Sequence, residues 1–252
     1  MPDALGVALA TPGLGWLILT ITIAGLIRGF TGFGTALIFV PVAGQFLPPE
    51  QILLLITATG VLSTTALMPR AWSVADRVDV VRLAGPAALA VPGGLWLGGQ
   101  MEPLAIRWVV AGIASVTLIA LMSGWRYGGI VRPAGLIGIG AASGLIGGVT
   151  GMTGPVVILF YLAGQKTAEI VRANTILFLA LLDLSIIILL AARGALDASI
   201  LWLAAVIGLP YFVTTRVGQA FFRPGAERAY RIAAYCVIAG AVLAGLPLFD
   251  EN

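Results

Sequence analysis

One apolar segment near the start of the chain is too long to cross a membrane as a single straight helix. Leu14–Phe46 is almost entirely apolar, and as one helix it would be about 50 Å long, against a hydrocarbon core of about 30 Å. A glycine cluster, Gly29–Gly34, must therefore interrupt it. The two pieces, Leu14–Ile27 and Thr35–Phe46, would each be about 20 Å long and too short to span. They predict one broken crossing, or a hairpin that folds inward and returns.

A second apolar segment, Ala134–Ala163, repeats this pattern in the second half of the chain. Aligning Ala24–Phe39 with Ser143–Ile158, at an offset of 119, gives six identical positions in sixteen. Paired, glycine-broken apolar segments in corresponding places indicate a transporter binding site. The alternative is close helix packing through small residues. The identical pairs are Gly25/Gly144, Leu26/Leu145, Ile27/Ile146, Gly29/Gly148, Thr31/Thr150 and Gly32/Gly151.

The rest of the sequence has the composition of a membrane protein. It is 60% hydrophobic and 10% charged, with a mean hydropathy of +1.05. Several apolar runs reach about 18 residues, which predicts an all-α polytopic membrane protein. The net charge of +3 is small and the basic residues lie in short loops, so we expect no nucleic-acid surface. No charged region precedes the first apolar stretch, so we expect no signal peptide.

The residue types that carry most protein chemistry are nearly absent. There is no histidine and only one cysteine, Cys236, which lies inside an apolar run. Metal sites and histidine-based triads depend on these residues. We therefore expect no metal, no cofactor and no enzymatic activity.

The chain divides into two expected repeats within one membrane domain, residues 1–127 and 128–252. Each repeat holds one broken segment followed by three ordinary spans, and charged loops are expected at Pro69–Arg82 and Gln165–Arg172. In the first repeat the broken segment is 14–46 and the spans are 51–68, 83–99 and 104–125. In the second repeat the broken segment is 134–163 and the spans are 174–192, 200–222 and 232–248.

The distribution of basic residues favours inward-folded hairpins for both broken segments. If both segments crossed the membrane, six basic residues would lie on each side; if both return, ten lie on one side and two on the other. The second distribution fits the positive-inside rule and puts both termini in the periplasm. Each repeat then crosses three times, so the repeats are inverted. The ten are Arg70, Arg77, Arg82, Arg126, Arg132, Lys166, Arg172, Arg223, Arg228 and Arg231, and the two are Arg107 and Arg193.

The two breaks are the predicted substrate site. Non-helical backbone at membrane depth must face protein or a water-filled cavity. Half-helices starting near Thr35 and Pro155 would present free N–H groups and the positive ends of their dipoles to an anion. Glycine lets an oxyanion approach the backbone, threonine adds hydroxyl donors, and Phe33 and Met152 either wall the cavity or simply pack. The other expected residues at the breaks are Thr31, Gly32, Gly34, Thr150, Gly151 and Thr153.

Four further polar residues in or near apolar segments are candidates for the site. Arg28 either binds the substrate or pairs with Asp183. Asp183 either balances an arginine or carries a coupling proton. Arg216 is a second candidate anion ligand, with snorkelling to the basic loop as its alternative. Asn174 is a candidate ligand or a helix cap.

The two glycine-rich breaks, Gly29–Gly34 and Gly147–Pro155, resemble the sulfite exporter TauE/SafE family, also called the toluene sulfonate uptake permease family. The resemblance extends over nearly the whole chain as a hydropathy pattern. It implies transport of sulfur oxyanions or organosulfonates across the bacterial inner membrane. This sequence interposes residues between the glycines of the family pattern, namely Thr31, Phe33, Thr150, Met152 and Thr153.

The combined expectation is a secondary transporter that moves an organosulfonate or sulfite by alternating access. Its partners would be the small anionic substrate and the lipid bilayer. An anion channel and a non-transporting membrane scaffold are the alternatives. The sequence leaves open the direction of transport, the coupling ion and the oligomeric state, a homodimer included.

Overall fold

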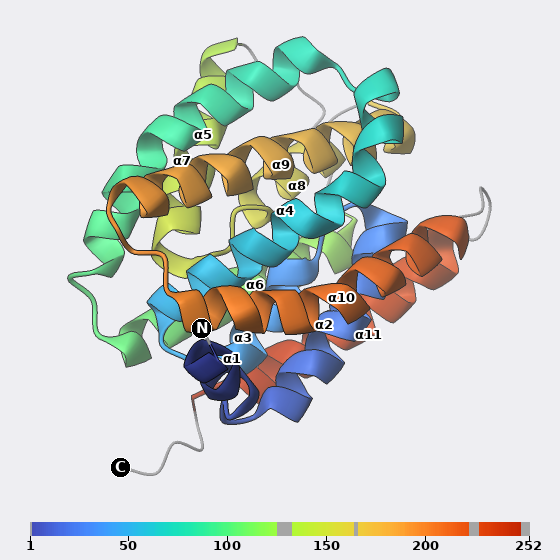
Figure 1. The fold of residues 1–252 in the computed structure, drawn as a ribbon. Coiled ribbons are helices and arrows are strands. Elements are labelled where there is room, and N and C mark those ends of the chain that lie inside the picture. The colour runs from blue at the N-terminus through green and yellow to red at the C-terminus, as the bar shows by residue number, and fades with distance from the viewer. Residues whose placement is uncertain (1, 125–132, 164–165, 222–226, 248–252) are drawn as a thin grey trace.

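The structure, a computed structural model, describes residues 2–124, 133–163, 166–221 and 227–247 (Figure 1). These residues form eleven helices and no strand, which confirms the all-helical class. Six helices are long and apolar enough to cross a membrane: α2, α4, α5, α6, α9 and α10. The helices are α1 (Pro2–Leu9), α2 (Leu14–Thr31), α3 (Thr35–Ala43), α4 (Pro49–Val74), α5 (Arg77–Gly98), α6 (Pro103–Ser123), α7 (Pro133–Thr150), α8 (Pro155–Ala163), α9 (Ala168–Ala192), α10 (Ala198–Phe221) and α11 (Glu227–Gly245).

Both glycine clusters interrupt their helices, as the sequence predicts. Three glycines at the breaks have a left-handed backbone: Gly32 with φ +83°, Gly34 with φ +101° and Gly151 with φ +74°. L side chains rarely adopt this conformation, so these positions need glycine. The glycine content of the motif is therefore a requirement of the backbone.

The two breaks share one hydrogen-bonding pattern. In each, a threonine ends the first helix. Its hydroxyl donates a hydrogen bond to the backbone carbonyl four residues earlier and accepts one from the backbone N–H two residues later. The bonds are Thr31 to Ile27 O (2.9 Å) and from Phe33 N–H (3.2 Å), and Thr150 to Ile146 O (2.7 Å) and from Met152 N–H (3.1 Å). After these threonines, the second break is one residue longer than the first before its half-helix begins. In the structure, Gly34 and Thr35 therefore correspond to Gly154 and Pro155.

The lengths of the pieces differ from expectation. We expected Leu14–Ile27 to be too short to span, but α2 continues to Thr31 and is about 27 Å long, close to the hydrocarbon thickness. The expectation fails because the helix runs through Gly29 and stops only at Gly32. By contrast, α3 and α8 have nine residues each and are half-helices of about 14 Å.

The first broken segment returns to the end of the bundle where it starts. A Cβ built on Gly13, which precedes α2, would collide with the ring of Phe46, which follows α3. Two helices continuing in one direction would hold these residues about 40 Å apart. The chain therefore forms a hairpin at the first break.

The second broken segment also returns, at the opposite end of the bundle. Helices α5 and α7 run parallel, because Gly140, Gly144 and Gly148 contact successive turns of α5 at Leu83, Ala87 and Val91. Lys166, just after α8, forms ion pairs with Asp76 and Asp79 at the start of α5. The end of α8 thus lies beside the start of α7. The long helix α4 separates this end from the entrance of the first hairpin.

The helices pack in the order α2, α10, α4, α9, α5, α7, with α4 and α9 between the two outer pairs (Figure 1). Glycines allow the outer pairs to approach closely: Gly25 and Gly29 of α2 meet the backbone of α10, and Gly144 and Gly148 of α7 meet that of α5. Close helix packing is therefore the role of these glycines, whereas Gly32, Gly34 and Gly151 form the breaks.

Two expected loops are largely helical. Helix α4 continues through Pro69 to Val74 and α5 begins at Arg77, so only two residues separate them where Pro69–Arg82 was expected to be a loop. Helix α9 begins at Ala168 and includes Arg172. Charged residues here extend spanning helices beyond their apolar part. The expected repeat boundary at 127/128 lies outside the described residues, as do Arg126, Arg132 and Arg223.

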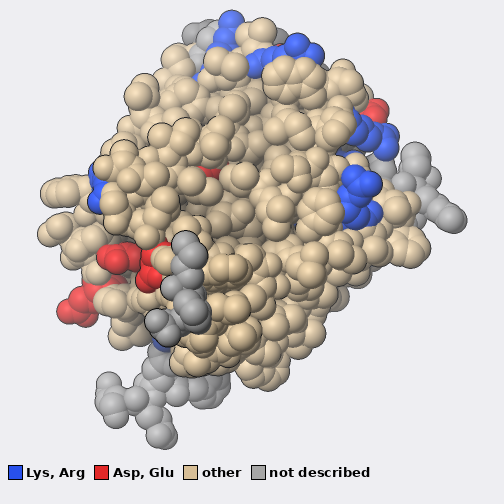
Figure 2. All heavy atoms as spheres, in the orientation of Figure 1, with Lys and Arg blue, Asp and Glu red and all other residues tan. Residues whose placement is uncertain are grey.

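Charged side chains lie mainly at the rim of the face shown in Figure 2, with a broad uncharged surface between them. Large exposed apolar side chains, such as Trp16, Leu89, Trp96 and Leu209, are at least 60% exposed. A surface of this kind fits contact with lipid. Together with the six long apolar helices, it supports a multi-pass membrane protein.

Candidate functional site

A central cavity of about 30 Å³ lies where the half-helices α3 and α8 begin. Its volume is enough for about two water molecules. The cavity brings together residues of α2, both breaks, α4, α9 and α10, and so it joins the two halves of the chain. Its lining residues are Arg28, Phe33, Gly34, Thr35, Ala36, Leu37, Ile56, Gly60, Gly151, Thr153, Gly154, Pro155, Leu179, Asp183 and Tyr211.

Among the residues that the structure describes, Arg28 is the one basic residue that lines this cavity, and it is only 3% exposed. It lies in the last turn of α2, and its Nη2 donates a hydrogen bond to Thr64 Oγ1 of α4 at 3.0 Å. Its Nε is buried and has no hydrogen-bond partner in the described part of the chain. A buried guanidinium with an unmade hydrogen bond is costly. An acceptor bound in the cavity would offset that cost.

Asp183 of α9 also lines the cavity and is 7% exposed. Its carboxylate lies against Gly60 of α4, where a Cβ would collide with Oδ2. No salt bridge joins Arg28 to Asp183 within the described residues. The two charges therefore share the cavity without the direct ion pair that was the alternative for Arg28.

The first turns of both half-helices face the same cavity. Gly34, Thr35 and Ala36 contribute from α3, and Gly154 and Pro155 contribute from α8. No side chain caps the start of α3. The Thr35 hydroxyl lies 2.7 Å from the hydroxyl of Tyr211 on α10, which fixes its position. Two positive helix ends and a guanidinium thus converge on one small space.

Three of the other predicted break residues line the cavity and four do not. Phe33, Gly151 and Thr153 line it. The hydroxyls of Thr31 and Thr150 bond to the backbone of their own breaks. Gly32 lies against Arg172, because a Cβ there would be 2.8 Å from Arg172 Cγ. Met152 is fully buried and packs in the core.

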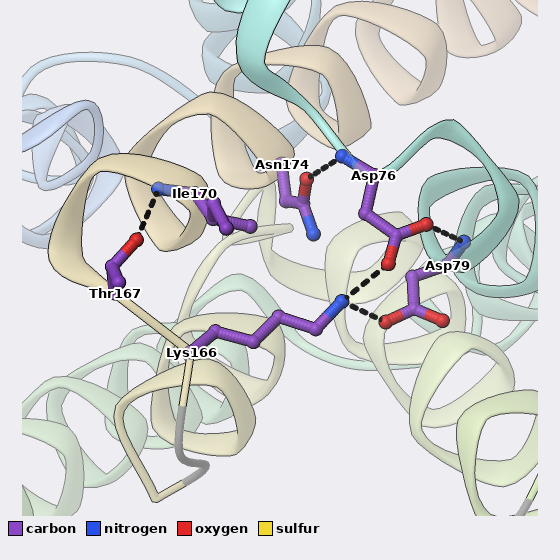
Figure 3. A network of polar contacts seen from close by, with 6 residues as sticks. All are labelled: Asp76, Asp79, Lys166, Thr167, Ile170 and Asn174. Atoms are coloured by element: carbon purple, nitrogen blue, oxygen red, sulfur yellow. Dashed lines mark hydrogen bonds and ion pairs between the residues drawn. The ribbon is translucent and has the colours of Figure 1, made fainter.

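Asn174 and Arg216 do not line the cavity either. Asn174 is buried and its Oδ1 accepts the Asp76 N–H at 2.8 Å, beside an ion-pair cluster of Lys166, Asp76 and Asp79 (Figure 3). The hydrogen bond from Lys166 holds the pKa of Asp76 below its usual value. Arg216 is exposed on α10. Their roles as ligands stay predictions that the geometry of this cavity does not favour.

Residues 17–245 match the family model described as Sulfite exporter TauE/SafE. The chain belongs to the sulfite exporter TauE/SafE family. Membership indicates a membrane transporter of sulfur-containing anions. Neither the curated proteins nor the solved structures contain a match to this chain.

Among the cavity residues that were not predicted from the sequence, Gly60, Thr64 and Tyr211 are small or polar. Gly60 and Tyr211 lie in long apolar helices with no local pattern that marks them. Thr64 follows a run of hydroxyl residues in α4, Thr57, Thr59 and Ser63, all of which bond to their own helix backbone. This run of hydroxyl residues is unusual in a spanning helix, and it was the sequence feature that could have pointed to Thr64.

Proposed function

We propose that the protein is a secondary transporter that moves a small organosulfonate or sulfite across the bacterial inner membrane by alternating access. The central cavity is the binding site. Arg28 and the starts of α3 and α8 bind the anionic group, and Phe33, Gly34, Gly151 and Thr153 shape the space around it.

The observation that carries this proposal is the convergence of three positive groups on one cavity. Each half-helix start presents backbone N–H groups and a partial positive charge. Arg28 adds a full charge with an unused buried donor. A sulfonate or sulfite carries oxygens on several sides of one sulfur, so it accepts hydrogen bonds from several directions at once. This chemistry matches the family, whose members are described as sulfite exporters.

Alternating access is supported by the reciprocal packing of the two halves. Helix α5 of the first half packs on α7 of the second, and α10 of the second half packs on α2 of the first. The hairpins enter from opposite ends of the bundle. This is the arrangement expected of inverted repeats, with a substrate site between them. The split of basic residues expected from the sequence, ten on one side and two on the other, favours periplasmic termini.

The proposal is tested by uptake into proteoliposomes containing the purified protein. The panel is sulfite, methanesulfonate, a larger aryl sulfonate and sulfate, each with radiolabel. We expect saturable uptake and countertransport of at least one sulfur anion, since an alternating-access site exchanges its substrate. Flux that rises linearly with concentration and shows no countertransport would indicate a channel. No flux of any of the four anions would contradict the proposal.

A further inference from the structure

Two buried hydroxyl groups meet at the central cavity. Thr35 Oγ1, on the first residue of α3, lies 2.7 Å from the phenol oxygen of Tyr211 on α10. Both residues line the cavity, and they are 4% and 0% exposed. The two side chains come from different halves of the chain, so this hydrogen bond joins the halves at the site itself.

The pair has one more hydroxyl proton than its own hydrogen bond uses. Each hydroxyl can donate once, and only one of the two protons lies between the oxygens. Other buried hydroxyls in the spanning helices, such as those of Thr57 and Thr175, donate to a carbonyl of their own helix. Thr35 has no such carbonyl, because the residues one turn earlier lie outside α3. Within the described residues neither hydroxyl of the pair has another partner, and Asp183, which also lines the cavity, is not bonded to them.

The remaining proton belongs to Thr35. A phenol is a stronger hydrogen-bond donor than an aliphatic alcohol, and the alcohol oxygen is the better acceptor, so Tyr211 donates to Thr35. Accepting this bond polarises the Thr35 hydroxyl and strengthens it as a donor. Thr35 also begins α3, whose first turn faces the cavity without a side-chain cap. Its hydroxyl and the backbone N–H groups of that turn are therefore placed to bond to the same acceptor.

The other half of the chain makes the corresponding contacts without either hydroxyl. The backbone of α10 at Tyr211 packs on a glycine of α2, and the backbone of α5 at Ala87 packs on the corresponding glycine of α7. Pro155 begins α8 where Thr35 begins α3. Alanine and proline thus satisfy the packing of one half, so the hydroxyl pair of the other half is not a requirement of the fold. Because both hydroxyl residues line the cavity, their chemistry is available to a substrate.

We infer that Thr35 donates a hydrogen bond to the bound sulfur anion, and that Tyr211 is a positioning residue that holds the Thr35 hydroxyl for this bond. The inference rests on the proposed function and adds a neutral donor to Arg28 and the two helix starts. A sulfonate accepts hydrogen bonds on every oxygen, so the bound anion satisfies the proton that the pair leaves over.

Thr35→Val tests the donor, because it removes the hydroxyl and nearly keeps the shape. Calorimetry on the purified protein measures binding of the four panel anions. The binding stoichiometry reports the fraction of competent sites, so a folding defect is separated from a loss of affinity. Thr35→Val should weaken binding by about tenfold or more, the usual loss for a hydrogen bond to a charged group. Thr35→Ser keeps the hydroxyl and should bind nearly as tightly as the parent.

Tyr211→Phe tests the positioning role, because it keeps the ring and removes only the phenol oxygen. It should weaken binding in the parent background and have no further effect in the Thr35→Val background, since Tyr211 acts through Thr35. A role in packing alone would not produce this coupling. Thr215→Val is the matched control: Thr215 is fully buried on α10, one turn after Tyr211, and lies outside the cavity lining. Its affinity should equal that of the parent.

Three results would contradict the inference in different ways. Parent affinity in Thr35→Val, or a loss in Thr35→Ser as large as in Thr35→Val, would overturn the donor and leave the proposed function intact. Equal losses from Tyr211→Phe in both backgrounds would show that Tyr211 does not act through Thr35. A parent that binds none of the four anions would contradict the proposed function, and this inference with it.

Discussion

At the scale of single residues, Arg28 is the position on which anion binding depends most. Its guanidinium is buried in the cavity with one donor unused and one bonded to Thr64. Arg28→Ala should weaken binding of the transported anion by about 2–5 kcal/mol, because a charge-assisted bond in a desolvated site is lost. Arg28→Lys should recover only part of the lost affinity, since lysine lacks the planar guanidinium that can donate two parallel hydrogen bonds. Calorimetry on purified variants measures the affinity.

Arg216→Ala is the matched control for this prediction, because Arg216 is exposed and outside the cavity lining. Its affinity should equal that of the parent. If Arg28→Ala binds as tightly as the parent and Arg216→Ala does not, the anion binds elsewhere and the cavity is not the site.

Asp183 provides a second prediction at this scale. Its carboxylate shares the cavity with Arg28 without pairing to it, so it is placed to exchange a proton with the cavity as substrate moves. Asp183→Asn is nearly isosteric and should abolish uptake against a gradient while sparing exchange of substrate across the membrane. Both are measured in proteoliposomes with and without a proton gradient. Parent levels of gradient-driven uptake would show that Asp183 is not the coupling group.

The sequence predicted Arg28, Asp183 and the glycines of the breaks because each is conspicuous in an apolar segment. It did not show which break residues face inward. Thr31 and Thr150 look like donors in the sequence, but each hydroxyl is used to bond the turn that the glycines create. Gly32 looks equivalent to Gly151, yet Arg172 of α9 lies against it. The contact at Gly32 depends on a helix more than a hundred residues away, which no local pattern encodes.

At the scale of helices, the contact between α5 and α7 depends on three glycines spaced four apart. A Cβ on Gly144 would collide with the carbonyl of Ala87, whereas one on Gly138, in the same helix, would meet nothing within 4 Å. Gly144→Ala should therefore lower the free energy of unfolding by about 1–3 kcal/mol, since overpacking forces the helices apart. Gly138→Ala should leave it unchanged or raise it by up to about 1 kcal/mol.

Thermal unfolding of both variants in detergent, followed by circular dichroism, measures this difference. Equal melting temperatures would mean that α5 and α7 are not in close contact at Gly144. The comparison is internal to one helix, so it does not depend on how alanine behaves in membrane helices in general.

Helix ends were harder to predict than the helices themselves. The breaks were predictable because a long apolar run cannot fit the bilayer unbroken. The ends of α4 and α9 were not, because Arg70, Glu169 and Arg172 read as loop residues. In the structure these side chains stabilise helices that project beyond the apolar core: Arg70 pairs with Glu169, and Arg172 donates to the carbonyl of Gly29 at 2.6 Å.

At the scale of the whole molecule, two independent observations lead to one topology. The charge count favours hairpins at both breaks. The contacts of Gly13 with Phe46, and of Lys166 with the start of α5, close those hairpins at opposite ends. The short connections between α4 and α5, α5 and α6, and α9 and α10 then assign these turns to one end or the other. The ion pair between Arg70 and Glu169 puts the end of α4 beside the start of α9, so both lie at the same end of the bundle.

This topology predicts which exposed positions can be labelled from outside the cell. In a Cys236→Ser background, Gln100→Cys and Ala195→Cys lie at the end of the bundle assigned to the periplasm, and Val78→Cys and Ser123→Cys lie at the other; all four are exposed. A membrane-impermeant maleimide should modify the first pair in intact cells and the second pair only after permeabilisation. The reverse pattern would invert the orientation and place both termini in the cytoplasm, against the charge bias. Labelling of Ala195→Cys and Val78→Cys from the same side would contradict the second hairpin. If α7 and α8 return, only α5, α6 and α9 cross between these positions, and three crossings put them on opposite sides.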